Sequence, residues 1–319
     1  MVDKAKAQSH TTERHYPSVR ACPPLADSSP APGTTKDTAQ RGRTRLAPTP
    51  SGYLHAGNAL NFLITERSAR SRGARLLLRI DDLDAERVRA EYVEDIFRSL
   101  DWLGITWDEG PSGPDDFRAK WSQQQRIPHY NGLLDALREQ GVLYACDCSR
   151  NALRNLTTDG RYAGACRSRG LDLDAPDVAW RIDLGDVQVV HVPGLFDQSI
   201  SVDLAQAIGD PVLRQRSGRP AYQLASLADD LHYGVTFIVR GMDLLPSSAC
   251  QLYISRILGL SIFEHVRFLH HRLITDEAGQ KLSKSAGATS LKAMREAGFE
   301  PAELHAMADR MLEELSTRG

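Results

Sequence analysis

Two short segments far apart in the chain carry side chains suited to phosphate chemistry. His55 and Gly57 stand in the segment HAGN, and Lys281 and Lys284 stand in KLSKS. A glycine lets the backbone approach a ligand closely, and an imidazole can donate to phosphate oxygens. Two ammonium groups in one loop can stabilise charge that builds up on a transferring phosphoryl or adenylyl group. Taken alone, HAGN also fits an ordinary turn, and the lysines fit a solvated basic loop.

Three cysteines form a second candidate site. Cys146, Cys148 and Cys166 lie in the segment YACDCSRNALRNLTTDGRYAGACRS, which contains no histidine. A disulfide would leave one cysteine over, and a tetrahedral metal ion would need a fourth donor. In an extended segment the first two thiols point the same way. The oxygen donors within this segment are Asp147, Asp159 and Tyr162. A metal site, a redox role and chance clustering remain open at this point.

The HAGN segment lies between elements that predict a βαβ unit. The pattern predicts a strand over 45–47, a helix over about 58–71 ended by Gly73, and a strand over 75–80. Such a unit implies a parallel sheet with ligands at the carboxyl ends of the strands. The amides and dipole at a helix N-terminus favour an anion there. HAGN therefore occupies the natural phosphate position of this unit.

Composition limits the class of protein. The chain has 319 residues, a net charge of −2 and 41% hydrophobic residues, which is ordinary for one large domain or two small ones. This charge excludes a globally basic nucleic-acid binder but leaves room for a local basic patch. No window approaches the roughly 18 apolar residues of a membrane span, and no secretory signal is evident. We expect a cytoplasmic protein without a membrane partner, and a monomer by default.

In combination, the motifs resemble the glutamyl branch of the class I aminoacyl-tRNA synthetases. HAGN, preceded by APTPSGYL, and KLSKS are similar to the class signatures usually written HIGH and KMSKS. The segments RIDDLD, WLGITWDEG, AYQLASLADD and GVTFIVRGMDLL make the resemblance specific, and it covers about residues 43–288. It implies an enzyme that joins L-glutamate to magnesium-bound ATP, releases pyrophosphate and leaves glutamyl-adenylate.

The resemblance also implies roles for the phosphate-site residues. His55, Lys281 and Lys284 match catalytic positions, and ATP contacts fall on His55, Gly57, Asn58 and Lys284. Asn58 stands where HIGH has its last histidine. With one imidazole fewer, more of the phosphate stabilisation falls on His55, the helix amides and the lysines.

A glutamate pocket needs an acid for the substrate ammonium and cations for its side-chain carboxylate. The positions that match the family's glutamate site are Arg45, Ala47, Thr49, Asp81, Tyr222 and Arg240. Asp81 is placed for the ammonium, but the glutamyl branch commonly has glutamate there and the glutaminyl branch has aspartate. Glutamine therefore remains open as a substrate. Arg240 favours a carboxylate, because a guanidinium facing a neutral amide would lack a counter-charge.

Compact members of the branch, the glutamyl-Q tRNA(Asp) synthetases, attach glutamate to queuosine in the anticodon of tRNA(Asp). Only 34 residues follow Ser285, so we expect this chain to lack an anticodon-binding domain as they do. The compact enzymes hold one zinc ion through C-x-C, a tyrosine and a cysteine four residues later. Here these positions are Cys146, Cys148, Tyr162 and Cys166. The gap between Cys148 and Tyr162 is slightly longer than expected.

The resulting fold prediction is α/β, with a Rossmann-like class I catalytic domain, an inserted zinc-binding subdomain and a small helical C-terminal stem. The predicted parts are a disordered tail rich in Pro, Ser, Thr and Gly (1–42), the first catalytic half (43–143), the inserted subdomain (144–195), the second catalytic half (196–270), and the KLSKS loop with the helical C-terminal segment (271–319). Three alternative functions remain: a truncated glutamyl-tRNA synthetase that charges a tRNA 3′ end, a non-catalytic glutamate-binding protein, and a nucleotidyltransferase of the wider HxGH group.

Overall fold

The computed structural model describes residues 42–149, 151–153, 157–158, 161–162, 164–185, 189–196, 198–273 and 290–317. The predicted tail, apart from Gly42, lies outside the described residues. So do Asp159 and both lysines of KLSKS, Lys281 and Lys284. The predictions made for these residues therefore stay predictions.

The first described segment folds as the predicted βαβ unit. Strand β1 (Arg43–Leu46) leads into helix α1 (Ala56–Ser71), and strand β2 (Arg75–Leu78) follows. The two strands pair in parallel, which confirms the predicted topology. Helix α1 begins two residues before the predicted start, because His55 caps its first turn. Strand β2 ends two residues before the predicted Ile80.

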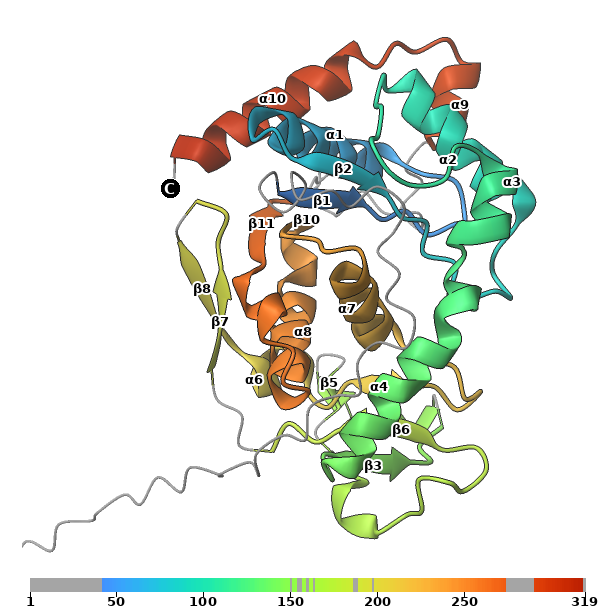
Figure 1. The fold of residues 1–319 in the computed structure, drawn as a ribbon, viewed down its shortest axis with the longest axis vertical. Coiled ribbons are helices and arrows are strands. Elements are labelled where there is room, and N and C mark those ends of the chain that lie inside the picture. Colours follow the sequence, from blue (N-terminus) through green and yellow to red (C-terminus); the bar gives the residue numbers. More distant parts are fainter. Residues whose placement is uncertain are drawn as a thin grey trace, which may run out of the picture.

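A second parallel pair of strands lies beside the first. Strands β10 (Phe237–Gly241) and β11 (Arg267–His271) pair along their whole length. The Thr236 backbone N–H donates to the Arg43 carbonyl at 2.8 Å and joins the two pairs at their starts. Figure 1 shows the four strands gathered beneath α1. The carboxyl ends of parallel strands are where α/β proteins bind ligands.

Helices cover the strands on both sides (Figure 1). On one side, α10 (Ala302–Thr317) lies across α1, near α2 (Ala90–Trp102) and α9 (Leu291–Glu296). On the other side lie α7 (Tyr222–His232) and α8 (Leu245–Ile257). This layered arrangement is the α/β architecture that the sequence predicts.

Short antiparallel strands follow α4 (Ile127–Glu139). One sheet has the order β3 (Leu143–Cys146), β6 (Ala179–Ile182) and β9 (Val212–Arg214). Two hairpins are formed by β4 (Thr157–Thr158) with β5 (Arg161–Tyr162), and by β7 (Val189–Pro193) with β8 (Ser199–Asp203). Strands β3 and β6 lie at the end of the molecule opposite α10 (Figure 1).

Short helical elements complete the described part of the chain. They are α3 (Pro114–Asp116), α6 (Leu204–Ile208), the π-helix Phe117–Trp121, and the 3₁₀ turns Gln123–Arg126, Arg167–Arg169, Met242–Leu244 and Ser261–His265. Among the described helices, none combines the length and the apolar content that crossing a membrane requires.

Two large clusters of buried apolar side chains form the core, apart from a small one at Cys146, Tyr162 and Cys166. One lies between α1 and the parallel strands and includes Leu46, Leu60 and Val239. The other packs α4, α7 and α8 together and includes Tyr130 and Leu227. Strands β1 and β10 contribute to the first cluster, and helix α7 contributes to the second. Polar side chains from these three elements meet between the two clusters, where the strands end.

Candidate active site and metal centre

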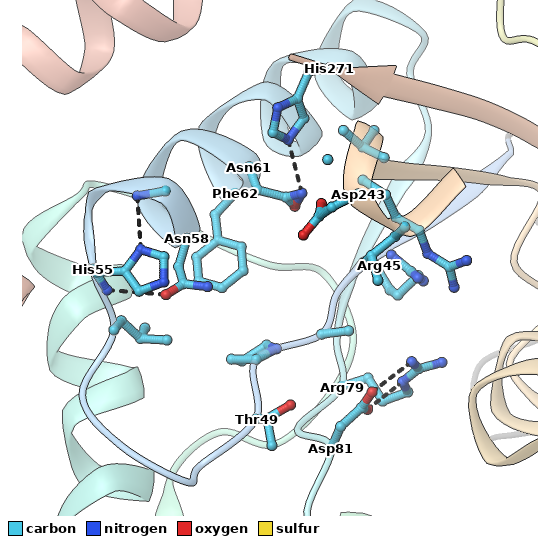
Figure 2. Close-up of a pocket in the computed structure, with 18 of the residues that line it drawn as sticks. Arg45, Thr49, His55, Asn58, Asn61, Phe62, Arg79, Asp81, Asp243 and His271 are labelled. Carbon is cyan, nitrogen blue, oxygen red and sulfur yellow. Dashed lines mark hydrogen bonds and ion pairs between the residues drawn. The ribbon is translucent and has the colours of Figure 1, made fainter. Parts of the chain in front are cut away.

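A pocket of about 500 Å³ opens at the N-terminus of α1, beside the ends of β10 and β11 (Figure 2). The structure brings every described residue of the predicted glutamate and ATP sites to its wall: Arg45, Ala47, Thr49, His55, Gly57, Asn58, Asp81, Tyr222 and Arg240. These residues come from segments up to about 195 positions apart in the chain. Side chains suited to glutamate and to phosphate therefore share one cavity.

The start of α1 is fixed by a reciprocal pair of hydrogen bonds. The Gly57 backbone N–H donates to His55 Nδ1 at 3.1 Å, and the His55 backbone N–H donates to Asn58 Oδ1 at 3.1 Å. Since Nδ1 accepts, the proton of the neutral imidazole sits on Nε2. A Cβ at Gly57 would lie 2.9 Å from His55 Cε1, so glycine leaves room for the ring. Asn58 thus holds the cap in place of the last histidine of HIGH.

The described residues that flank the KLSKS segment lie at this pocket. Leu273, the last residue described before it, lines the pocket. Ser290, the first described after it, forms a β-bridge with His55, and the Leu291 backbone N–H donates to the Leu54 carbonyl at 2.8 Å. The described residues on both sides of the KLSKS segment therefore lie at the walls of the site.

One buried carboxylate holds three arginines behind the pocket. Asp230 Oδ1 lies 2.8 Å from Arg45 Nε and 2.8 Å from Arg79 Nη1, and its Oδ2 lies 3.7 Å from Arg240 Nη2. Burial opposes ionisation of Asp230, but the three guanidinium groups outweigh it and lower the pKa of this carboxyl. Arg79 also pairs with Asp81 at 2.7 Å, so the three cations face two close carboxylates and a local excess of positive charge remains.

The two arginines of the predicted glutamate site are used differently. Arg240 Nη1 donates to Ser248 Oγ at 3.1 Å and to Gln251 Oε1 at 2.7 Å, and Nη2 donates to Ser226 Oγ at 3.4 Å. Arg45 donates to Asp230 through Nε. Within the part of the chain that the structure describes, no hydrogen bond occupies its Nη atoms. Arg45 is therefore the better placed of the two to bind an anionic group in the pocket.

Asp81 does not stand alone as the predicted ammonium site. Arg79 binds it with two hydrogen bonds, from Nε at 2.7 Å and from Nη2 at 2.9 Å. Burial raises the pKa of Asp81, although the Arg79 pair opposes this shift. The sequence analysis missed Arg79, which also lines the pocket. Its signal was an arginine two positions before an aspartate at the end of a buried strand.

Three further polar residues of the pocket were also not predicted: Asn61, Asp243 and His271. Figure 2 shows them on the side of the pocket away from Asp81. His271 Nδ1 donates to the Arg272 carbonyl at 2.9 Å, so Nε2 accepts from Asn61 Nδ2 at 3.3 Å. A Cβ at Gly241 would lie 2.6 Å from Asp243 Oδ1, so glycine allows this close approach. Asn61 could have been found from its spacing, one helical turn after Asn58.

The three cysteines and Tyr162 converge on one point. Tyr162 Oη lies 3.6 Å from both Cys146 Sγ and Cys148 Sγ, and Cys148 Sγ lies 3.4 Å from Cys166 Sγ. All three sulfurs lie within 4.8 Å of one another, and none is in a disulfide. Zinc bonds of about 2.3 Å to sulfur and about 2.0–2.2 Å to oxygen give tetrahedral edges of roughly 3.5–3.8 Å. The donor set therefore fits a zinc ion.

Backbone pairing positions these donors. Cys146 ends β3 opposite Ala179 of β6, so Cys148 lies beyond the strand rather than on it. The Tyr162 carbonyl accepts from the Asp210 backbone N–H at 2.9 Å. Gly209 has a φ of +65°, and a Cβ there would lie 2.5 Å from the Tyr162 carbonyl. A glycine is therefore required where the two chain segments touch.

Two arginines beside the cysteines are engaged in ion pairs. Arg167 contacts the carboxylate of Asp210 at 2.5 Å and that of Asp183 at 3.0 Å. Arg169 contacts Asp147, whose carboxylate lies 3.8 Å from Cys166 Sγ. These arginines therefore tie this part of the chain together internally.

Comparison with known protein families identifies the family of the chain that forms this pocket. The model of the family described as "tRNA synthetases class I (E and Q), catalytic domain" matches residues 42–174 and 194–313. The chain belongs to this family. The resemblance expected from HAGN and KLSKS is confirmed, and so is the α/β catalytic domain.

Similar proteins include glutamyl-Q tRNA(Asp) synthetases and glutamate–tRNA ligases. The chain is 35% identical to the glutamyl-Q tRNA(Asp) synthetase of Nitratidesulfovibrio vulgaris, over 82% of this chain and 83% of the relative. The enzyme of that name from Pseudomonas fluorescens is 40% identical, over 76% and 75%. Glutamate–tRNA ligase 1 of Ruegeria pomeroyi is 36% identical, over 84% of this chain. The chain spans 60% of the length of that ligase.

A solved structure supports the fold of the class I (E and Q) domain. The glutamate–tRNA synthetase of Elizabethkingia anophelis superposes with a TM-score of 0.64 at 24% identity, over 81% of this chain and 54% of that one. This likeness concerns the fold alone.

Proposed function

We propose that the chain activates L-glutamate with magnesium-bound ATP to form glutamyl-adenylate. An oxygen of the glutamate α-carboxylate attacks the α-phosphorus, the bond to the bridging oxygen breaks, and pyrophosphate leaves. The observation that carries this proposal is the single cavity that joins the arginine-rich end around Arg45 to the N-terminus of α1. The family name and the relatives named as glutamate ligases support it.

At the glutamate end, Arg45 takes the side-chain carboxylate, and Arg240 adds positive charge from its bonded position. Asp81 takes the substrate ammonium and shares its negative charge with Arg79. Tyr222, at the start of α7, Ala47 and Thr49 complete this end of the pocket. An amide in place of the carboxylate would leave the excess positive charge without a counter-ion, so glutamate is favoured over glutamine.

At the ATP end, His55 Nε2 and the positive end of the α1 dipole bind the phosphates, with Gly57 and Asn58 shaping the turn. Lys284, helped by Lys281, stabilises the charge that develops on the α-phosphate. Both lysines lie outside the described residues, so this role is supported by sequence resemblance and by the β-bridge between His55 and Ser290, the first residue described after them.

Glutamate-dependent exchange of labelled pyrophosphate into ATP tests the activation step. Lys284→Ala should abolish exchange while the circular dichroism spectrum stays unchanged. Lys120→Ala is the matched control, because Lys120 is exposed and pairs with Asp116 on the surface. Exchange at the wild-type rate in Lys284→Ala would remove Lys284 from the mechanism. Pyrophosphate exchange that is as efficient with glutamine as with glutamate would contradict the assignment of glutamate as the substrate.

For the second step we propose queuosine of tRNA(Asp) as the acceptor: a hydroxyl of its cyclopentene-diol ring attacks the mixed anhydride and releases AMP. The names of two relatives support this acceptor, and a third relative, a glutamate–tRNA ligase, supports the tRNA 3′ end as the alternative. Nuclease digestion of tRNA labelled with radioactive glutamate separates the two. Label in the anticodon fragment supports queuosine, and label on the terminal adenosine supports 3′ charging.

We further propose that one zinc ion binds Cys146, Cys148, Tyr162 and Cys166. The ion would act structurally, by cross-linking the end of β3 to the segment around Tyr162. The fit of the donor distances to a tetrahedron supports this site. Metal analysis should find one zinc ion per chain, and mass spectrometry that finds a disulfide instead would favour the redox alternative.

A further inference from the structure

Arg181 is a buried cation beside the proposed zinc ligands. It lies on β6, is 6% exposed, and places its guanidinium carbon 4.0 Å from the centre of the Tyr162 ring. Its Nη1 donates to the main-chain carbonyl of Asp210 at 2.5 Å, and its Nε has no hydrogen-bond partner. Among the described residues, no carboxylate lies within ion-pair distance of Arg181.

Two acids in this part of the chain, Asp210 and Asp147, are committed to other groups. The Asp210 carboxylate accepts from Tyr144 Oη at 2.6 Å and from Arg167 Nε at 2.6 Å. Asp147 pairs with Arg169. A buried charge without a partner costs several kcal/mol, so Arg181 needs negative charge from another source.

The proposed metal centre supplies that charge. Three thiolates and one phenolate around a divalent ion leave two negative charges in excess. Arg181 faces the ring of Tyr162, and Arg169 Nη1 lies 3.4 Å from Cys166 Sγ. Arg169 already has a counter-charge in Asp147, whereas Arg181 has no carboxylate partner among the described residues. The charge of Arg181 is therefore the one that the metal centre would balance.

The same contacts fix where the phenol oxygen points. The Cys166 backbone N–H donates to Tyr162 Oη at 2.9 Å, so a lone pair of the oxygen is already used as an acceptor. Arg181 and the main chain of Tyr162 are both attached to Asp210, through its carbonyl and its N–H respectively. The guanidinium and the main chain of Tyr162 are therefore held by the same residue.

We propose that Arg181 is a positioning residue of the metal centre, which balances its excess negative charge and holds the Tyr162 phenolate toward the ion. The proposal rests on the zinc site inferred above. It assigns to Arg181 a role in metal binding and none in contact with glutamate or ATP.

Zinc affinity, measured by competition with a chromophoric chelator, tests this role. Arg181→Met should weaken binding at least tenfold, and Arg181→Lys, which keeps the charge without the planar stacking, should lie between Met and wild type. Arg214→Met is the matched control, because Arg214 stacks on Trp180 at 4.7 Å in the same sheet. It should bind zinc as the wild type does.

A spectroscopic readout separates this role from a merely structural one. Zinc added to metal-free wild type should produce the near-ultraviolet difference band of a tyrosinate, and Tyr162→Phe should remove the band. Arg181→Met should diminish the band, and in the Tyr162→Phe background it should weaken zinc binding less than in wild type. Equal affinity and an equal band in Arg181→Met and wild type would overturn the proposal. Wild type that binds no zinc would instead overturn the zinc site.

Discussion

At the scale of residues, the pocket is defined by how buried charges are shared. Asp230 is fully buried and faces Arg45, Arg79 and Arg240. Arg79 also pairs with Asp81, so Arg45 and Arg240 are left to share the charge of Asp230. Arg240 compensates with hydrogen bonds to neutral side chains, whereas Arg45 keeps its Nη donors for the cavity. The side-chain carboxylate of the proposed substrate would complete this arrangement.

Replacing Arg45 tests this division of roles. Arg45→Gln should raise KM for glutamate at least tenfold, equivalent to about 1.4 kcal/mol, because the main donor to the side-chain carboxylate is lost. The ratio of exchange with glutamate to exchange with glutamine should fall as well. Arg98→Gln, on an exposed helix surface, serves as the control. A larger KM effect in Arg240→Gln than in Arg45→Gln would reverse the assignment.

His270 gives a pH dependence of stability with a defined sign. Burial, aided by Arg240, lowers the pKa of this imidazole to about 3. In the unfolded chain its pKa is about 6.5, so between these values the unfolded state binds one proton more. The free energy of unfolding should therefore fall as pH drops through this window, by up to about 1.4 kcal/mol per pH unit. Above a pH of about 6.5, this contribution of His270 to the free energy of unfolding should be fully present.

Urea unfolding at several pH values measures this contribution. His270→Gln should show a shallower decline than wild type within the window, because the variant lacks the titrating group. Identical slopes for the two proteins would show that His270 is not kept neutral by folding.

At the scale of elements, the N-terminus of α1 carries the proposed phosphate site. Its capping box uses the imidazole of His55 and the amide of Asn58, and the turn between them is tight. The sequence predicted the βαβ unit because apolar strands, Gly73 and the helical pattern are local signals. It placed the helix start two residues late, because the cap is made by a histidine rather than by a preferred capping residue.

Gly57→Ala tests the geometry of this turn. The added Cβ would lie 2.9 Å from His55 Cε1 and 3.1 Å from Nδ1, so the imidazole must move. Pyrophosphate exchange should fall at least tenfold, whereas the free energy of unfolding should change by less than about 1 kcal/mol. In Gly132→Ala, nothing lies within 4 Å of the added Cβ, and exchange should be unchanged. Wild-type exchange in Gly57→Ala would show that the position of His55 is not critical.

At the scale of the whole molecule, the site lies where the two core clusters meet. Asp229 on α7 accepts from Gln123, Arg126 and Tyr130, which joins α7 to the segment that starts α4. The adjacent Asp230 holds the arginines of the strands. Sequence motifs located most of the residues that line the pocket. They did not reveal Asp230 or the pairing of Asn61 with His271, because these contacts join segments far apart in the chain and no local pattern encodes them.

The proposed reaction activates glutamate in this pocket and then delivers it to queuosine. The most direct measurement is incubation with labelled glutamate and ATP, using tRNA(Asp) that contains queuosine and the same tRNA with guanosine at that position. We predict glutamate-dependent labelling of the queuosine-containing tRNA alone. Equal labelling of both tRNAs would contradict the proposed acceptor and favour charging of the 3′ end.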